Sequence, residues 1–315
     1  MAHCCGKSRY AGLFTGVISR AVLVVLFAAS GAPAGVAGVV GEDDRRRPGE
    51  ADHDLIQSLG LVVCRQGGRA QRRRSIGTGT LVGNTSTVLT VAHNFIDDRN
   101  GSAPAIQFDP VEDCSFRQYD ETGELRAEVG FVRSQVGDYW SNRGRPNQDW
   151  AVLRTTRALP DSSVALSFVT QEDLPQGLAG ESVRVVAFHA DRRDRRRLPL
   201  LSEGQVLGVN YGGYDRLAHT ADMGRMSSGG ALVIRSKSGR NLVIGIHRSS
   251  ASFGEFNLAV PVSSELEQAL RAYAWGQTPV AVETLAWQSA MGGSPTAGIN
   301  RIPLLISDEF RGETP

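Results

Sequence analysis

The sequence predicts an all-β fold built from antiparallel sheets, closed as sandwiches or barrels. Runs of four to six residues rich in Val, Ile, Leu and Thr recur along the chain, each bounded by Gly, Asn, Asp or Ser. They do not alternate with helices, as the strands of a doubly wound parallel sheet would. The runs are residues 61–64, 79–82, 87–91, 129–132, 150–154, 183–188, 205–209, 231–234, 242–246 and 258–262.

A single helix is expected after these strands, over residues 264–275. Ser263 or Ser264 can cap its first turn, and apolar residues recur on one face at helical spacing. Those residues are Leu266, Ala269, Leu270 and Tyr273. Beyond the helix, Pro, Gly, Ser and Thr separate small apolar clusters, which predicts a C-terminal extension over 276–315 that packs weakly or is partly disordered.

The first residues have the pattern of a secretory signal peptide, over residues 1–37. Lys7, Arg9 and Arg20 precede an apolar run at 21–29, and small residues follow it. The run is too short to span a bilayer, although an uncleaved membrane anchor is an alternative interpretation. We therefore expect a secreted or periplasmic protein with no stable membrane insertion after signal removal.

The balance of charge argues against a nucleic-acid partner. The chain has 34 Lys and Arg, 33 Asp and Glu, and a net charge of +1. Removal of the signal peptide takes away three basic residues and no acidic ones, which leaves a charge near −2. Proteins that bind nucleic acid usually carry a strongly basic face, so nucleic acid is not an expected partner.

Three segments combine residue types suited to nucleophilic catalysis. Residues 77–83 (GTGTLVG) and 87–93 (TVLTVAH) form a strand pattern that leads into His93. In residues 147–153 (NQDWAVL), Asp149 stands directly before an apolar strand. In residues 222–232 (DMGRMSSGGAL), Ser228 lies in a glycine-bearing turn before another strand, where missing Cβ atoms allow close approach to the backbone. Each pattern alone is common.

The order of the three residues makes the combination specific. The order is His, Asp, Ser, with separations of 56 and 79 residues. From about Gly41 to Trp275 the chain resembles trypsin-like serine proteases, whereas α/β-hydrolases and subtilisins have other orders. The resemblance implies two packed antiparallel β-barrels, roughly 50–160 and 161–263, and a C-terminal helix at 264–275, all within a protease domain at 38–275.

Two further segments resemble the bacterial V8-like, or glutamyl endopeptidase, group. Residues 39–45 (VVGEDDR) are similar to the mature N-terminal region of that group. Residues 244–247 (IGIH) and 255–260 (EFNLAV) are similar to its specificity-pocket strands.

The resemblance implies a serine endopeptidase that acts on protein or peptide substrates. His93 would accept the Ser228 proton and return it to the leaving amine, while Asp149 would fix the imidazole tautomer. Backbone N–H groups of Met226 and Ser228 would hold the oxyanion. This chemistry requires neither a metal nor another cofactor.

Two residues near the nucleophile need separate consideration. Ser227 is an alternative nucleophile, but the family motif places the reactive serine directly before Gly-Gly, which favours Ser228. Met226 stands where the family usually has glycine. A side chain there would strain the loop or turn an oxyanion donor away, so a weakly active or inactive relative stays open.

Two residues indicate opposite charges for the preferred substrate residue. In the V8-like group the histidine matching His247 helps receive an acidic side chain before the scissile bond. Asp222 matches the pocket aspartate with which trypsin receives Lys or Arg. A carboxylate at the pocket base would repel glutamate. The match of 244–260 to the V8-like group favours the acidic preference, and structural roles for both residues are the alternative.

Cys64 and Cys114 are the only cysteines after the predicted signal peptide. An isolated pair in an oxidising compartment is more often a disulfide than two thiols, so we expect a bond that closes the loop around His93. The chain-entropy estimate for such a loop is about 4 kcal/mol. Two buried thiols are the alternative.

Two other classes of function share parts of the pattern. One is a catalytically silent homologue that uses the double barrel to bind a partner. The other is a carboxylic-ester hydrolase, which would need a Gly-x-Ser-x-Gly turn and alternating helices. The sequence contains neither feature, so the ester hydrolase is disfavoured.

Overall fold

The computed structural model describes residues 38–66, 73–97, 105–106, 108–139, 146–169, 178–191, 198–209, 216–236, 238–251 and 255–276. The signal peptide predicted at 1–37 lies outside the described residues. So does the predicted C-terminal extension beyond Gly276. Among the residues described, no helix has the length and apolar character needed to cross a bilayer.

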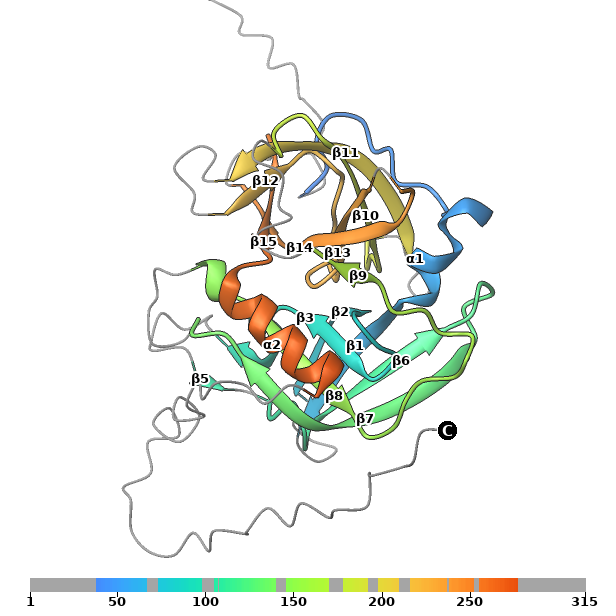
Figure 1. The fold of residues 1–315 in the computed structure, drawn as a ribbon, viewed down its shortest axis with the longest axis vertical. Helices are drawn as coiled ribbons and strands as arrows, with labels where there is room; N and C mark the ends of the chain where they lie inside the picture. Colours follow the sequence, from blue (N-terminus) through green and yellow to red (C-terminus); the bar gives the residue numbers. More distant parts are fainter. Residues whose placement is uncertain are drawn as a thin grey trace, which may run out of the picture. The chain divides into compact units, whose positions relative to one another are not determined.

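The first half of the chain forms a closed antiparallel barrel of six strands (Figure 1). Hydrogen bonding runs around the barrel in the order β1, β2, β3, β8, β7 and β6 before it returns to β1. The strands are β1 (Leu59–Gln66), β2 (Arg73–Leu81), β3 (Thr87–Thr90), β6 (Cys114–Tyr119), β7 (Leu125–Val136) and β8 (Ala151–Thr155). A small antiparallel pair, β4 (Ile96–Asp97) and β5 (Ala105–Ile106), lies outside the barrel.

The second half forms another six-stranded antiparallel barrel. Its order is β13, β10, β11, β12, β15 and β14, and the pairing of β14 with β13 closes the ring. The strands are β10 (Ser182–Ala187), β11 (Leu200–Val209), β12 (Leu217–His219), β13 (Ala231–Arg235), β14 (Asn241–Ser250) and β15 (Asn257–Pro261). A short strand, β9 (Ser167–Phe168), adds to β14 in parallel. The predicted all-β class with two barrels is confirmed.

Short helical elements lie at the ends of strands. They are the 3₁₀ turns η1 (Glu50–Asp52), η2 (Ala92–Phe95) and η3 (Pro146–Gln148), and the helix α1 (His53–Gln57). The C-terminal helix α2 spans Ser264–Trp275, as predicted. The Ser263 side chain accepts a hydrogen bond from the Leu266 N–H, and Gly276 ends the helix at a φ of 67°.

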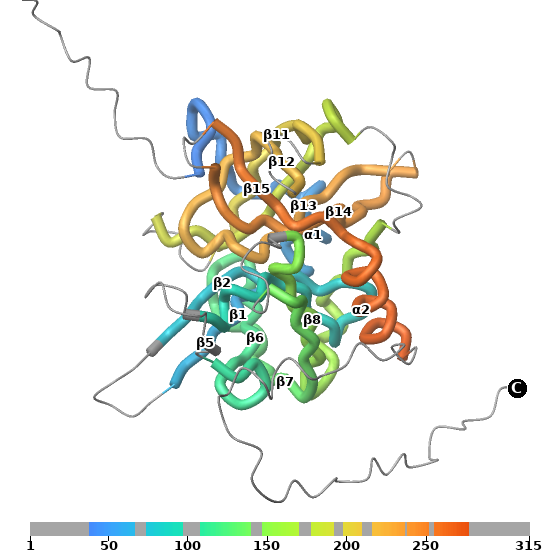
Figure 2. Tube along the Cα trace, turned by 90° about the vertical axis from the view of Figure 1, so that its left-hand side faces the viewer, coloured from blue at the N-terminus to red at the C-terminus, as the bar shows by residue number. Residues whose placement is uncertain are grey.

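The first and last segments of the described part of the chain each cross from one barrel to the other. Arg46 bridges to Leu201 of β11, so the N-terminal segment packs on the second barrel before the chain enters the first. Helix α2 leaves the second barrel and lies beside β8 of the first (Figure 2). There Asn84 and Arg154 donate hydrogen bonds of 2.6 Å to the carbonyls of Ala274 and Tyr273.

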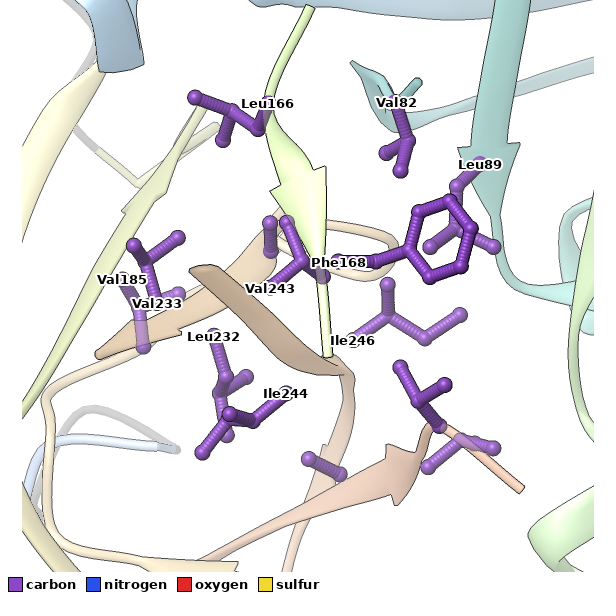
Figure 3. Packing of buried hydrophobic residues seen from close by; sticks show 14 of the residues in the cluster. Val82, Leu89, Leu166, Phe168, Val185, Leu232, Val233, Val243, Ile244 and Ile246 are labelled. Carbon is purple, nitrogen blue, oxygen red and sulfur yellow. The ribbon is translucent and has the colours of Figure 1, made fainter. Parts of the chain in front are cut away.

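Apolar side chains of both barrels form one continuous core cluster. Figure 3 shows Phe168 among Val82 and Leu89 of the first half and Ile246 of the second. A smaller cluster, which includes Val62, fills the interior of the first barrel alone. Burial of a large apolar side chain stabilises a fold by about 1.5 to 3 kcal/mol, so the shared cluster resists separation of the barrels.

The expected disulfide joins Cys64 of β1 to Cys114 of β6. The two residues are direct partners in the β1–β6 ladder, and both are buried. The bond spans a sequence separation of 50 and closes the segment that contains His93.

We expect the double substitution of Cys64 and Cys114 by Ser to lower the free energy of unfolding by about 2 to 5 kcal/mol, since it frees the unfolded chain from a long closed loop. Chemical denaturation of oxidised, reduced and substituted protein measures the difference. Two free thiols in non-reduced protein from its native compartment, found by mass spectrometry, would contradict the assignment.

Candidate active site

His93 and Asp149 are brought together by the pairing of β3 with β8. The two strands are antiparallel, with Thr90 opposite Ala151, so the residues after β3 and before β8 share one end of the barrel. Both Asp149 oxygens contact His93: the backbone N–H of His93 donates to Oδ1 at 2.9 Å, and Nδ1 lies 2.8 Å from Oδ2.

The carboxyl of Asp149 is fully buried and ionised. Burial alone would raise its pKa, but His93 and the guanidinium of Arg248 outweigh that effect and hold the pKa below its usual range. A carboxylate can only accept hydrogen bonds, so Nδ1 of His93 carries the hydrogen and Nε2 is left as the basic nitrogen. The His93 side chain is 28% exposed, which leaves part of the ring accessible.

Ser228 lies in the loop before β13, in the second barrel. Its Oγ donates to the carbonyl of Arg248 at 3.2 Å. Within the described part of the chain, no hydrogen bond joins Ser228 Oγ to His93 Nε2. The neighbouring Ser227 is buried, and its hydroxyl donates to the Gly224 carbonyl at 2.6 Å. Ser227 therefore holds the turn internally, and Ser228 is the more accessible of the two hydroxyls.

Thr78 of β2 fixes this loop from the opposite barrel. Its N–H donates to the Ser228 carbonyl at 2.8 Å, and its hydroxyl donates to the Met226 carbonyl at 2.8 Å. Gly229 has a φ of +92°, and a Cβ there would lie 2.0 Å from the Thr78 carbonyl oxygen. The glycine after Ser228 is thus required by close approach of two backbones as well as by its φ.

Met226 is in the left-handed region, with a φ of 74°. The carbonyl of Arg225 accepts a hydrogen bond from the Ala190 N–H at 2.8 Å. The C=O of Arg225 and the N–H of Met226 belong to one trans peptide and point in opposite directions. The bond to Ala190 therefore directs the Met226 N–H away from Ala190. No described residue accepts a hydrogen bond from the N–H of Met226 or of Ser228, so both donors can serve a ligand.

Arg248 of β14 is a site residue that the sequence analysis missed. Its Nε donates to Asp149 Oδ2 at 2.6 Å, the same oxygen that contacts His93 Nδ1. Its Nη2 donates to the Tyr139 hydroxyl at 3.1 Å, and its guanidinium lies over the Tyr139 ring. The available signal was a cationic residue directly after His247 in a strand assigned to the site.

Asp222 is buried and binds the N-terminal segment. Its Oδ1 accepts from the Val40 N–H at 2.6 Å, and its Oδ2 accepts from the Asp44 N–H at 2.9 Å. Burial raises the pKa of the Asp222 carboxyl to about 6, although these N–H groups oppose the shift. The carboxyl expected as a pocket residue is thus occupied by backbone donors of residues 38–45.

The same N-terminal segment places the buried guanidinium of Arg45 against Gly224, in the loop before Ser228. Arg45 has a side chain 1% exposed and contacts Asp43 and Asp191 at 2.8 and 2.7 Å. A Cβ at Gly224 would lie 2.5 Å from its guanidinium. The sequence pattern gives no sign of this cluster, because Asp191 lies 146 residues from Arg45 in the chain.

His247 is buried against His219 of β12. Its Nδ1 lies 3.4 Å from His219 Nε2, and the rings meet edge to face. Burial lowers the pKa of His219 to about 3 and that of His247 well below its usual range. Both rings are therefore neutral at physiological pH, and the imidazolium expected to attract an acidic side chain is absent from the free protein.

A separate hollow of about 650 Å³ lies elsewhere on the surface. It is bordered by His53, Glu121 and Leu198 among others, and by none of the predicted catalytic residues.

The neutral histidines predict a loss of stability in acid. The unfolded state binds protons below pH 6.5, whereas His219 in the folded state does so only near pH 3, so stability falls as pH decreases through this window. We expect His219→Gln to reduce that slope by about 1.4 kcal/mol per pH unit, the value for one proton.

Urea denaturation at several pH values between 4.5 and 7.5 measures the slope. His53→Gln, at an exposed position, controls for the loss of one imidazole. Equal slopes for the wild-type protein and His219→Gln would contradict a neutral, buried His219.

Comparison with solved structures supports the fold assignment. A Glu endopeptidase in complex with MPD matches at 17% identity with a TM-score of 0.56, covering 76% of this chain and all of that one. The protease Anisep from Arthrobacter nicotinovorans matches at 17% identity and a TM-score of 0.51, covering 70% of this chain and 96% of that one. A thermostable serine protease, AL20, from an extremophilic microorganism matches at 18% identity and 0.51, covering 72% and 99%.

No curated protein sequence matches the chain. A family model described as a trypsin-like peptidase domain matches residues 77–246, a range that contains His93, Asp149 and Ser228. With two closed barrels and a family match over more than half of its length, the chain belongs to the trypsin-like peptidase family.

Proposed function

We propose that the protein is an exported serine endopeptidase that cleaves peptide bonds through an acyl-enzyme. The observation that carries the proposal is the contact of His93 Nδ1 with a buried, ionised Asp149, which leaves Nε2 as the base. Ser228 lies across from this pair on a loop that Thr78 fixes. Export rests on the signal-peptide pattern of residues 1–37.

Catalysis begins when Ser228 Oγ attacks the scissile carbonyl carbon and its proton passes to His93 Nε2. The Ser228 hydroxyl must first turn away from the Arg248 carbonyl, which breaks the hydrogen bond of 3.2 Å between them. The N–H groups of Met226 and Ser228 stabilise the tetrahedral oxyanion, and each such donor is typically worth about 10² to 10³ in rate. Nε2 then protonates the leaving amine, and water releases the acyl group by the reverse sequence.

A catalytically silent binding protein is the second candidate. The observation that favours it is the orientation of Ser228 Oγ towards the Arg248 carbonyl rather than towards His93. Covalent labelling separates the two candidates, because only an activated serine reacts with a fluorophosphonate.

We expect a fluorophosphonate probe to label the secreted protein at Ser228, as located by peptide mapping. Ser228→Ala should abolish labelling, and His93→Ala should slow it by about 10³-fold or more, because the base is lost. Ser227→Ala, the matched control, should still be labelled. A folded wild-type protein that resists the probe, or a label on Ser227, would count against the peptidase.

The preferred substrate has an acidic residue before the scissile bond. Asp222 is occupied by two backbone donors, which removes the basis for a Lys or Arg preference. His247 is the polar group that matches the V8-like pocket. Since its ring is neutral in the free protein, an acidic side chain must accept a hydrogen bond from it or raise its proton affinity on binding.

A peptide-library digest tests this preference. We expect cuts after Glu or Asp that weaken as pH rises, because proton uptake by His247 becomes harder. His247→Ala should remove the preference, and Asp222→Ser should not convert it. Preferred cuts after Arg or Lys, abolished by Asp222→Ser and unaffected by His247→Ala, would show that Asp222 sets the specificity.

A further inference from the structure

Asp149 accepts one more hydrogen bond than a His–Asp pair requires. His93 Nδ1 and Arg248 Nε meet the same oxygen, Oδ2, at 2.8 and 2.6 Å, while the His93 N–H occupies Oδ1. The charge that stabilises a protonated His93 is therefore shared with a permanent cation.

Arg248 is held in this position by several contacts. Its side chain is only 16% exposed. Nη1 donates to Ser249 Oγ at 3.3 Å, Nη2 donates to the Tyr139 hydroxyl, and the guanidinium lies 5.5 Å from the Tyr139 ring centre. The ion pair is therefore a built feature of β14 rather than a loose surface contact.

The main chain of Arg248 also reaches the nucleophile. Its carbonyl accepts the hydrogen bond from Ser228 Oγ at 3.2 Å. One residue thus contacts the carboxylate through its side chain and the serine through its backbone.

A nearby cation opposes protonation of His93. Asp149, before β8, favours the imidazolium, whereas Arg248 on β14 disfavours it by direct repulsion and by pairing with Asp149. The other titratable group on β14 that faces this region, His247, is neutral, and Tyr139 contacts Arg248. Removal of the guanidinium leaves the carboxylate to His93 alone.

We propose that Arg248 is a positioning residue that shares Asp149 with His93 and thereby extends the activity of His93 as a base towards lower pH. The proposal rests on the proposed peptidase function, since it assigns a role within that site. It adds a positively charged residue to the Asp–His pair, and it predicts that loss of Arg248 narrows the pH range of the reaction from its acidic side.

The test compares Arg248→Ser with the wild-type protein in the pH dependence of kcat/KM on a peptide substrate. We expect the acidic limb of Arg248→Ser to move to higher pH by about 1 unit, the order expected for one nearby charge at a partly buried site. Arg117→Ser is the matched control. It also removes one cation, whose side chain is 17% exposed and paired with Glu128 at 2.6 Å, but on β6, a strand that carries none of the site residues.

A second readout does not require activity. The Nδ1 proton of His93 gives a low-field proton resonance in nuclear magnetic resonance spectra, identified by its loss in His93→Ala. We expect this resonance to move to lower field in Arg248→Ser, because Oδ2 then accepts from His93 alone. A shifted resonance in protein that hydrolyses nothing would uphold the role of Arg248 and count against the peptidase.

Tyr139→Phe keeps the aromatic ring but removes the hydroxyl that Nη2 contacts, and it serves if Arg248→Ser does not fold. It should shift the acidic limb and the resonance in the same direction by a smaller amount. If the wild-type and variant proteins have the same pH dependence of kcat/KM and the same His93 Nδ1 proton resonance, the proposal is overturned. An equal shift in Arg117→Ser would also overturn it, because it would trace the effect to net charge.

Discussion

The carboxylate of Asp149 is fully buried, and donors from both barrels compensate its negative charge. The effective penalty for burying a single ion is several kcal/mol, so the charge requires partners with good geometry. His93 contributes two donors from the first barrel, and Arg248 contributes one from the second. Separation of the barrels would leave this charge without its cation, which ties the packing of the two halves to the chemistry of the site.

The loop that carries Ser228 is held by two independent supports. Thr78 binds the carbonyls at both ends of residues 226–228 from the first barrel. On the other side, residues 38–45 place their N–H groups on Asp222 and the Arg45 guanidinium beneath Gly224. Residues 38–45 therefore pack against the second barrel and support the loop of Ser228. The position of Asp222 in the motif, six residues before Ser228, serves this anchoring in the present structure.

The sequence was sufficient to predict those features that depend on local pattern. The ten predicted apolar runs lie in or at the ends of strands, and the helix at 264–275 has the expected bounds, because both signals come from periodicity and capping within one segment. Strand β6 was missed since its exposed face carries Ser115 and Arg117, and β12 was missed since it has three residues. The disulfide followed from the number of cysteines.

Features that depend on long-range contacts could not be predicted in this way. The ion pair of Arg248 with Asp149 joins residues 99 apart, and that of Arg45 with Asp191 joins residues 146 apart. Periodicity carries no information about such separations. The neutral state of His247 is a further example, because it results from burial against His219, a residue on a different strand.

The conformation of Met226 bears on whether a side chain in this position would turn an oxyanion donor away. A non-glycine residue in the left-handed region costs about 1 to 2 kcal/mol, and persists only where its surroundings fix it. Here the Arg225 carbonyl is bound by Ala190, the Met226 carbonyl by Thr78, and the Ser227 N–H by the Gly224 carbonyl. These bonds fix both peptides that flank Met226. The direction of its N–H is therefore set by the backbone, while its side chain packs against the core. Glycine at this position would relieve strain, but the surrounding hydrogen bonds already determine where the donor points.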